Sequence, residues 1–278
     1  MRRLAAGTAA LALMAALGGA VTSLAAGPKV YVGLFKDDAV AVIDTTQSRV
    51  VATIPVPKGP HGLVVTPDGR KAYVSSDGAS TVSVIDTASD RVTGSIDVGP
   101  NPHGLAMSPD GKKVLVAGYG SSRALVIDTA SDRVVGEIGV PQVHNGTIGP
   151  DGRRAWVASQ KQGATALVIL DLQTFTQVGA VPLDKTPRAL DASPDGKRVY
   201  FTLAGVNAIQ VLDTATNQIV AQIPVGASPH QAPPTADGRW ALTPAQGPGE
   251  LGILDTTSNT VAATVPVPVP FFVTVKVF

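Results

Sequence analysis

The chain has 278 residues, of which 22 are basic, 21 are acidic and 44% are hydrophobic, and its formal net charge is +1. A near-neutral chain lacks the basic field of a typical nucleic-acid-binding protein, so we expect no nucleic-acid partner. Because the chain contains no cysteine, disulfide bonds and cysteine-ligated metal centres are excluded.

The first 26 residues have the pattern of a secretory signal peptide. Two arginines follow Met1, an uncharged Ala- and Leu-rich stretch continues to residue 26, and Ser23-Leu24-Ala25 fits a cleavage site. An uncleaved membrane anchor is the alternative, because the stretch is nearly long enough to span a bilayer. We predict a periplasmic or secreted protein of residues 27–278, with no membrane association after cleavage and with 20 basic against 21 acidic residues.

Residues 27–278 repeat with a period of about 42 residues. A motif of Ile or Leu followed by Asp recurs at steps of 42, 42, 43, 42 and 42 residues, beginning at Ile43, Ile85, Ile127, Leu170, Leu212 and Leu254. Each copy contains four short alternating apolar runs separated by turn residues, which predicts four β-strands, named A to D from the inside outwards. Four strands in about 40 residues make one propeller blade, so we predict an all-β, six-bladed β-propeller of four-stranded blades in one domain.

The two ends of the repeat array predict how the ring closes. Pro-Asp-Gly turns separate strands A and B in four copies, and Ala236 replaces the proline in the fifth. Residue 27 corresponds to the turn between strands A and B, so residues 27–278 begin with strand B. The first blade therefore has its strands B, C and D at residues 30–35, 39–44 and 50–56. We expect the final segment, residues 271–276, to pair with them as strand A and to remove an open sheet edge.

The repeats resemble those of the bacterial YVTN-family β-propeller. The resemblance is carried by runs such as residues 81–92 (TVSVIDTASDRV) and 108–117 (SPDGKKVLVA), and it covers essentially all of residues 27–278. It implies an exported or cell-surface binding protein, although many such propellers have seven blades. Because propellers carry unrelated functions on one scaffold, the resemblance is specific for the fold and weak for activity.

Several repeated polar and aromatic positions are interpreted as structural. The aspartate of each Ile/Leu-Asp motif precedes a turn rich in Thr, Ser and Asn, where its side chain can accept backbone N–H bonds. Trp156 and Trp240 fall on strand B and are predicted to pack between blades. Asp191, three residues after Arg188, is predicted to be a structural partner of that arginine.

Histidine is confined to one repeat position, in the loop from strand D to the inner strand A. In the six blades this position holds His61, His103, His144, Arg188, His230 and Phe271. Because inner strands surround the axis of a propeller, we predict that these six side chains form a ligand-binding ring at one mouth of the central channel. The short B–C loops should emerge on the same face, at residues 76–81, 118–123, 159–165, 204–208 and 245–250.

Three interpretations of this ring stay open. The histidines could be turn residues that donate to backbone carbonyls. They could hold a divalent transition metal such as Zn²⁺, Cu²⁺ or Fe²⁺, with His61, His103, His144 and His230 as ligands. They could also bind an anion or another small ligand, for which Arg188 would suit a carboxylate or phosphate. With rings roughly 8 Å apart, each charged pair would cost about 2 kcal/mol at an effective dielectric of about 20, so four protonated imidazoles are not expected at pH 7.

The function predicted from these patterns is an exported module that binds an unidentified small molecule or protein through the histidine-lined mouth. The alternative is a metal-dependent periplasmic enzyme of the lyase or lactone hydrolase type, in which a His-bound cation polarises a carbonyl. No single segment contains a Ser/His/Asp arrangement or a phosphate-binding glycine loop, so no catalytic residue is predicted.

Overall fold

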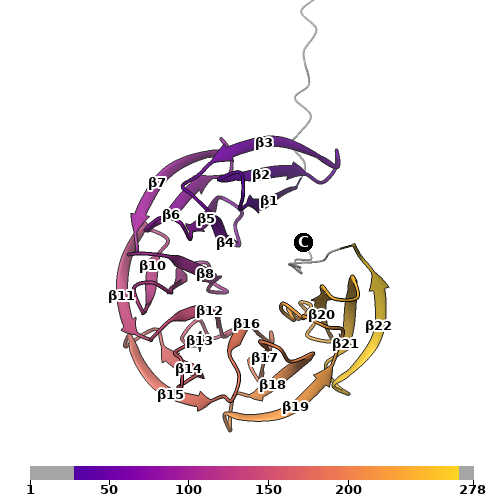
Figure 1. Cartoon of the computed structure of the whole chain (residues 1–278). Coiled ribbons are helices and arrows are strands. Elements are labelled where there is room, and N and C mark those ends of the chain that lie inside the picture. Colours follow the sequence, from indigo (N-terminus) through magenta and orange to yellow (C-terminus); the bar gives the residue numbers. More distant parts are fainter. Residues whose placement is uncertain (1–27, 269–278) are drawn as a thin grey trace, which may run out of the picture.

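The computed structural model describes residues 28–268, which form six antiparallel sheets around a common centre (Figure 1). Every secondary-structure element assigned within these residues is a β-strand. The described residues contain no helix long and apolar enough to cross a membrane. Four sheets have four strands: β4 (Pro60–Val65), β5 (Lys71–Ser76), β6 (Thr81–Asp86) and β7 (Arg91–Asp97); β8 (Pro102–Met107), β9 (Lys113–Gly118), β10 (Arg123–Asp128) and β11 (Arg133–Gly139); β12 (Val143–Ile148), β13 (Arg154–Ser159), β14 (Ala166–Asp171) and β15 (Thr176–Pro182); β16 (Pro187–Ala192), β17 (Arg198–Leu203), β18 (Ala208–Asp213) and β19 (Gln218–Pro224).

The two remaining sheets have three strands among the described residues. They are β1 (Lys29–Leu34), β2 (Ala39–Asp44) and β3 (Arg49–Pro55), and β20 (Trp240–Ala245), β21 (Glu250–Asp255) and β22 (Thr260–Pro266). In Figure 1 the strands β4, β8, β12 and β16 lie nearest the centre, and β3, β7, β11, β15, β19 and β22 form the outer wall. The predicted all-β, six-bladed propeller is therefore confirmed.

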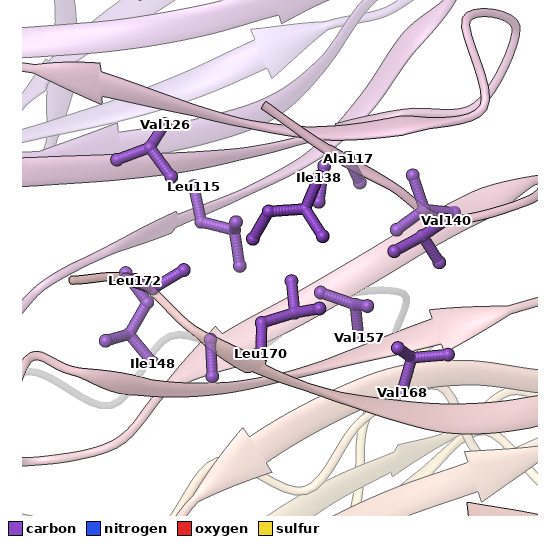
Figure 2. Close-up of a cluster of buried hydrophobic side chains, with 13 residues drawn as sticks. Leu115, Ala117, Val126, Ile138, Val140, Ile148, Val157, Val168, Leu170 and Leu172 are labelled. Atoms are coloured by element: carbon purple, nitrogen blue, oxygen red, sulfur yellow. The ribbon is translucent and has the colours of Figure 1, made fainter. Parts of the chain in front are cut away.

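The hydrophobic core lies between the blades. In the cluster drawn in Figure 2, Leu115 and Ile138 from one sheet pack against Val157 and Leu170 from the next sheet. Four further clusters join the other neighbouring sheets of the described chain in the same way. Middle strands such as β5 and β9 are buried over most of their length because each has a blade on both faces. Each of the five clusters within residues 28–268 therefore belongs to two blades.

The predicted turns between strands A and B are confirmed. In the first of them, the Gly69 N–H donates to the carbonyl of Thr66 over 2.8 Å, and Gly69 has a φ of 71°. Only glycine adopts this conformation without strain from a β-carbon. The copy with Ala236 in place of proline forms the same turn, with a φ of 68° at Gly238.

The blade that contains β20–β22 departs from the four-stranded prediction. Its inner segment makes only two isolated bridges, Pro229 with Ala245 and Pro234 with Ala241. Prolines 229, 233 and 234 have no backbone N–H, so this segment cannot donate the full ladder of an inner strand. The predicted closing strand at residues 271–276 lies outside the described residues.

Candidate functional site

A β-bulge places the histidines at the start of the inner strands. His61, His103 and His144 are the second residues of β4, β8 and β12, and each lies where the pairing register with the next strand shifts. A bulge of this kind releases a residue from the ladder and redirects its side chain. Gly62 follows His61 and permits close packing, because a β-carbon there would lie 2.6 Å from the carbonyl oxygen of His103.

The three imidazoles form a continuous stack. The ring centroids of His61 and His103 are 3.7 Å apart with an interplanar angle of 38°, and those of His103 and His144 are 3.9 Å apart with an angle of 35°. The structure thus brings three of the six predicted ring residues together, much more closely than the roughly 8 Å taken from propeller geometry. This group of three side chains is called the histidine stack below.

Hydrogen bonds fix the orientation of the stacked rings. The Nδ1 of His103 lies 3.0 Å from the carbonyl oxygen of His144, so this nitrogen carries the proton and donates. The Nδ2 of Asn145 lies 3.0 Å from the Nδ1 of His144, which therefore accepts. The His144 ring is in turn hydrogen-bonded to the backbone of Arg188. The prediction that histidine could donate to a carbonyl is confirmed for His103, whose partner is the equivalent position of the next blade.

Burial keeps the stacked imidazoles uncharged at neutral pH. The pKa of His61 is lowered to about 4, mainly by desolvation and to a smaller extent by electrostatic repulsion from His103. The negative charge of Asp77 acts in the opposite direction. Desolvation and the other two rings lower the pKa of His144 to about 3, and the positive charge of Arg188 adds to this effect. Desolvation also lowers the pKa of His103, although the hydrogen bond to the backbone of His144 raises it in part.

The remaining predicted ring residues are less uniform. Arg188 is exposed at the start of β16, and its charge lowers the pKa values of both His144 and His230. His230 follows Pro229, its pKa is lowered mainly by desolvation, and its side chain is hydrogen-bonded to Gln246. Phe271 lies outside the described residues.

The stack is not arranged as a preformed metal centre. Among residues 28–268, no group of three or more His, Cys, Asp or Glu side chains could hold a metal ion together. The physical reason is that the lone pairs that bind a metal lie in the plane of the imidazole, whereas the rings face one another through their flat sides. Metal binding by the four histidines stays a prediction.

A hollow of about 650 Å³ opens beside the stack. It is lined by residues from three successive blades: Asp77, Asn101, His103, Tyr119, Gly120, Ser122, Gln142, His144 and Gln160. Three of the predicted B–C loops contribute to it, which confirms that those three loops emerge on the same face as the histidines. Tyr119 closes one side, with its ring centroid 6.3 Å from that of His144 at an angle of 81°.

Sequence reasoning did not single out the three amides that line this hollow. Asn101 and Gln142 each stand two residues before a histidine, and both have a positive φ, of 50° and 46°. The signal that could have identified them is this constant offset from the histidine position. Gln160 begins the third B–C loop, and its side chain donates to the carbonyl of Pro187 over 2.8 Å.

The prediction for Asp191 was wrong about its partner. Its Oδ2 accepts a 3.0 Å hydrogen bond from the backbone N–H of Ala232 in the neighbouring inner segment, and no ion pair with Arg188 is formed within the described residues. Because the proline-rich segment around Ala232 has no regular ladder, its N–H needs a side-chain acceptor. Burial raises the pKa of Asp191 to about 6.

The repeated aspartates have the predicted structural role. Asp86 Oδ1 accepts from the backbone N–H of Ser89 over 2.8 Å, and Asp128 Oδ1 accepts from that of Ser131 over 2.8 Å. The hydroxyl of the same serine also donates to each carboxylate, and the hydroxyl and backbone bonds together lower the pKa of both carboxyl groups. Trp156 is 2% exposed and packs between two blades, as predicted. Trp240 is partly exposed, with the Arg239 guanidinium 5.0 Å from its ring centroid.

Comparisons with known proteins agree with this architecture. No curated protein matches the chain. The solved structure of Kuenenia stuttgartiensis hydrazine synthase is similar with a TM-score of 0.78 and 21% identity, over 90% of this chain and 90% of that chain. At this identity the likeness shows the fold alone.

Two family models match the sequence. The model described as Choice-of-anchor I domain matches residues 65–237, and the model described as YNCE-like beta-propeller matches residues 13–107. The first covers more than half of the chain, and the second agrees with the YVTN-type repeats. The chain therefore belongs to the Choice-of-anchor I domain family; its described residues form a six-bladed propeller, with which the YNCE-like match over residues 13–107 agrees.

Proposed function

We propose that the protein is an exported binding module whose small-molecule ligand occupies the hollow beside the histidine stack. The observation that carries the proposal is the convergence of nine residues from three blades on one hollow of about 650 Å³. Binding sites for small molecules are concave and have volumes of roughly 300–1,000 Å³. The N-terminal arginines, apolar stretch and cleavage-like tripeptide support export to the periplasm or the medium.

The histidine stack contributes rigidity to this site. The bonds from His103 to His144 and from Asn145 to His144 hold the rings in place at the edge of the hollow. Side chains that are already ordered and desolvated lose little conformational entropy when a ligand binds. The structural bonds of the imidazoles and a binding role are therefore compatible.

The proposal is tested on protein recovered from the periplasmic fraction, whose N-terminal sequence should begin near residue 27. Thermal unfolding is followed with neutral sugars, amino acids, organic acids, amines and ZnCl₂ as probes. We expect at least one organic class to raise the Tm. We also expect Gln142→Ala, which shortens a lining side chain, to reduce this rise by more than half.

The matched control is Gln222→Ala on the exposed outer strand β19, which should respond to the probes like the wild type. No Tm rise with any organic class, or equal rises in both variants, would contradict the proposal. Stabilisation by ZnCl₂ alone would instead favour the metal-dependent alternative. A full-length chain retained in the cytosol would contradict export.

A further inference from the structure

We propose that the hollow recognises a neutral, hydroxyl-rich ligand, namely a saccharide of one or two rings. This inference rests on the proposed function and names the ligand class of the same site. Three properties of the lining residues support it: their charge, their spare hydrogen-bonding groups and their aromatic rim.

The lining residues carry little charge. Asp77 is the one acidic side chain among the nine lining residues, and neither lysine nor arginine is among them. The two lining imidazoles are uncharged at pH 7, because burial holds their pKa values below the usual range. A phosphate or carboxylate ligand would therefore meet no cation in the hollow itself. An organic cation would meet only one carboxylate among the lining residues. It would also be repelled by the positive charge of Arg188, which acts on His144 at the edge of the hollow.

The hollow offers more hydrogen-bond acceptors than donors. The Asn101 amide nitrogen donates to the carbonyl of Asp77 over 2.8 Å, and the Gln160 amide nitrogen donates to that of Pro187 over 2.8 Å. The Nδ1–H of His103 is engaged by His144. These bonds leave two amide oxygens and the Nε2 lone pair of His103 as acceptors, in addition to the Asp77 carboxylate.

Hydroxyl groups suit such a surface. Each sugar hydroxyl can donate one hydrogen bond to these acceptors and can accept from groups that retain a donor. The Tyr119 hydroxyl, the Ser122 hydroxyl and the Gln142 amide supply both functions. A polar group that a ligand covers without pairing it costs free energy, so a ligand with many adaptable hydroxyls satisfies this lining better than an apolar or purely anionic one.

The rim supplies an apolar surface for the carbon skeleton of a sugar. The Tyr119 ring lies 6.5 Å from His103 and 6.3 Å from His144, so aromatic rings border the hollow on adjoining sides. Aromatic rings combine large apolar contact area with a negatively polarised face, to which the slightly positive C–H groups of a pyranose are attracted. The volume of about 650 Å³ is sufficient for one or two such rings.

The test is titration calorimetry with glucose, galactose, N-acetylglucosamine, maltose and cellobiose, and with glucuronate and glucosamine as charged counterparts. We expect at least one neutral sugar to bind, with its charged counterparts weaker by at least about tenfold. Its affinity should change little between 50 and 500 mM salt, because screening acts on charges. Tyr119→Ala should weaken binding by at least about tenfold, and Tyr119→Phe by less, because the phenylalanine keeps the ring face.

The outcomes separate this inference from the proposed function. Binding of amines or acids without neutral sugars would overturn the saccharide assignment and leave the binding module intact. Binding of a neutral sugar with equal affinity by wild type and Tyr119→Ala would place the sugar elsewhere and overturn the assignment. Gln222→Ala again serves as the control that should bind like the wild type. A lack of any response in the wider thermal screen would remove the proposed function itself.

Discussion

At the scale of single residues, the histidine stack shows how burial changes the chemistry of a side chain. An isolated imidazole titrates near neutral pH, but the pKa of His61 is about 4 and that of His144 is about 3 in this protein. Desolvation is the larger cause, and repulsion between stacked rings adds to it. The rings therefore serve as neutral hydrogen-bonding groups instead of cations.

This burial predicts that acid destabilises the fold before most of its carboxylates titrate. In the unfolded chain the imidazoles bind protons below a pH of about 6.5, whereas in the folded chain His61 and His144 resist protonation until pH 4 or lower. The contribution of the neutral imidazoles to the free energy of unfolding is therefore fully present above the unfolded-state pKa of about 6.5. It is lost as the pH falls toward the pKa values of the folded state. Asp191 opposes this loss, because its raised pKa of about 6 stabilises the folded state at lower pH. We expect a net decrease of about 2 kcal/mol in the free energy of unfolding from pH 7 to pH 5.

Urea denaturation at pH 7, 6 and 5 measures this dependence. His144→Gln should make it shallower, because glutamine does not titrate, and Asp191→Asn should make it steeper, because the opposing carboxyl group is removed. A free energy of unfolding that stays constant from pH 7 to pH 5 in the wild type and both variants would show that the rings are not desolvated as described.

At the scale of elements, neighbouring blades are joined by a repeated polar contact. Lys71 and Tyr73 on β5 both reach Asp132 in the turn between β10 and β11, with distances of 2.7 Å from the Lys71 Nζ and 2.6 Å from the Tyr73 hydroxyl. Lys29 and Tyr31 on β1 make the same contacts with Asp90. Each contact links residues about 60 positions apart, so it holds one blade to the next.

We predict that Asp132→Ala lowers the free energy of unfolding by about 1–3 kcal/mol, because the Tyr73 hydroxyl and the Lys71 ammonium lose an acceptor in a partly buried position. Asp132→Asn should cost less, because asparagine keeps an acceptor oxygen and tolerates the φ of 52° at this position. Denaturation at pH 7 compares both variants with Asp37→Asn, an exposed turn position that should have no measurable effect. Equal stability of wild type and Asp132→Ala would show that the contact contributes nothing.

At the scale of the whole molecule, stability is shared because each core belongs to two blades. The five hydrophobic clusters within the described residues join successive sheets, from the sheet of β1–β3 to the sheet of β20–β22. Loss of one blade would expose the apolar face of its neighbour, so the blades are expected to unfold together.

The two tryptophans allow this cooperativity to be measured. Trp156 lies on β13 and Trp240 on β20, in different blades. Single-tryptophan variants Trp240→Phe and Trp156→Phe would each report on one region by fluorescence, beside far-ultraviolet circular dichroism for the whole molecule. We expect both signals of each variant to give the same urea midpoint. A midpoint for either tryptophan that differs from the circular dichroism of the same variant would indicate independent unfolding of blades.

Much of the fold could be read from local chemistry. The 42-residue period, the apolar runs and the Pro-Asp-Gly turns depend on neighbouring residues; the period and the turns reappear in the structure, and four of the six sheets have all four strands. The position of the histidines on one face also follows from repeat register. The segment near Pro233 and Pro234 does not form the predicted inner strand. The prediction assumed that every copy follows the same repeat pattern, but the prolines of this copy lack the backbone N–H donors that a strand requires.

The sequence alone determined the number of blades, their strand order and the face on which His61, His103 and His144 lie, because all three follow from periodicity along the chain. Only the tertiary structure decided that these rings stack within 4 Å, that Asp191 accepts from Ala232, and that amides two residues before the histidines border a hollow. Those features depend on how closely one inner strand approaches the next. That distance is set by packing between blades, where residues about 40 positions apart come into contact, and no local pattern records it.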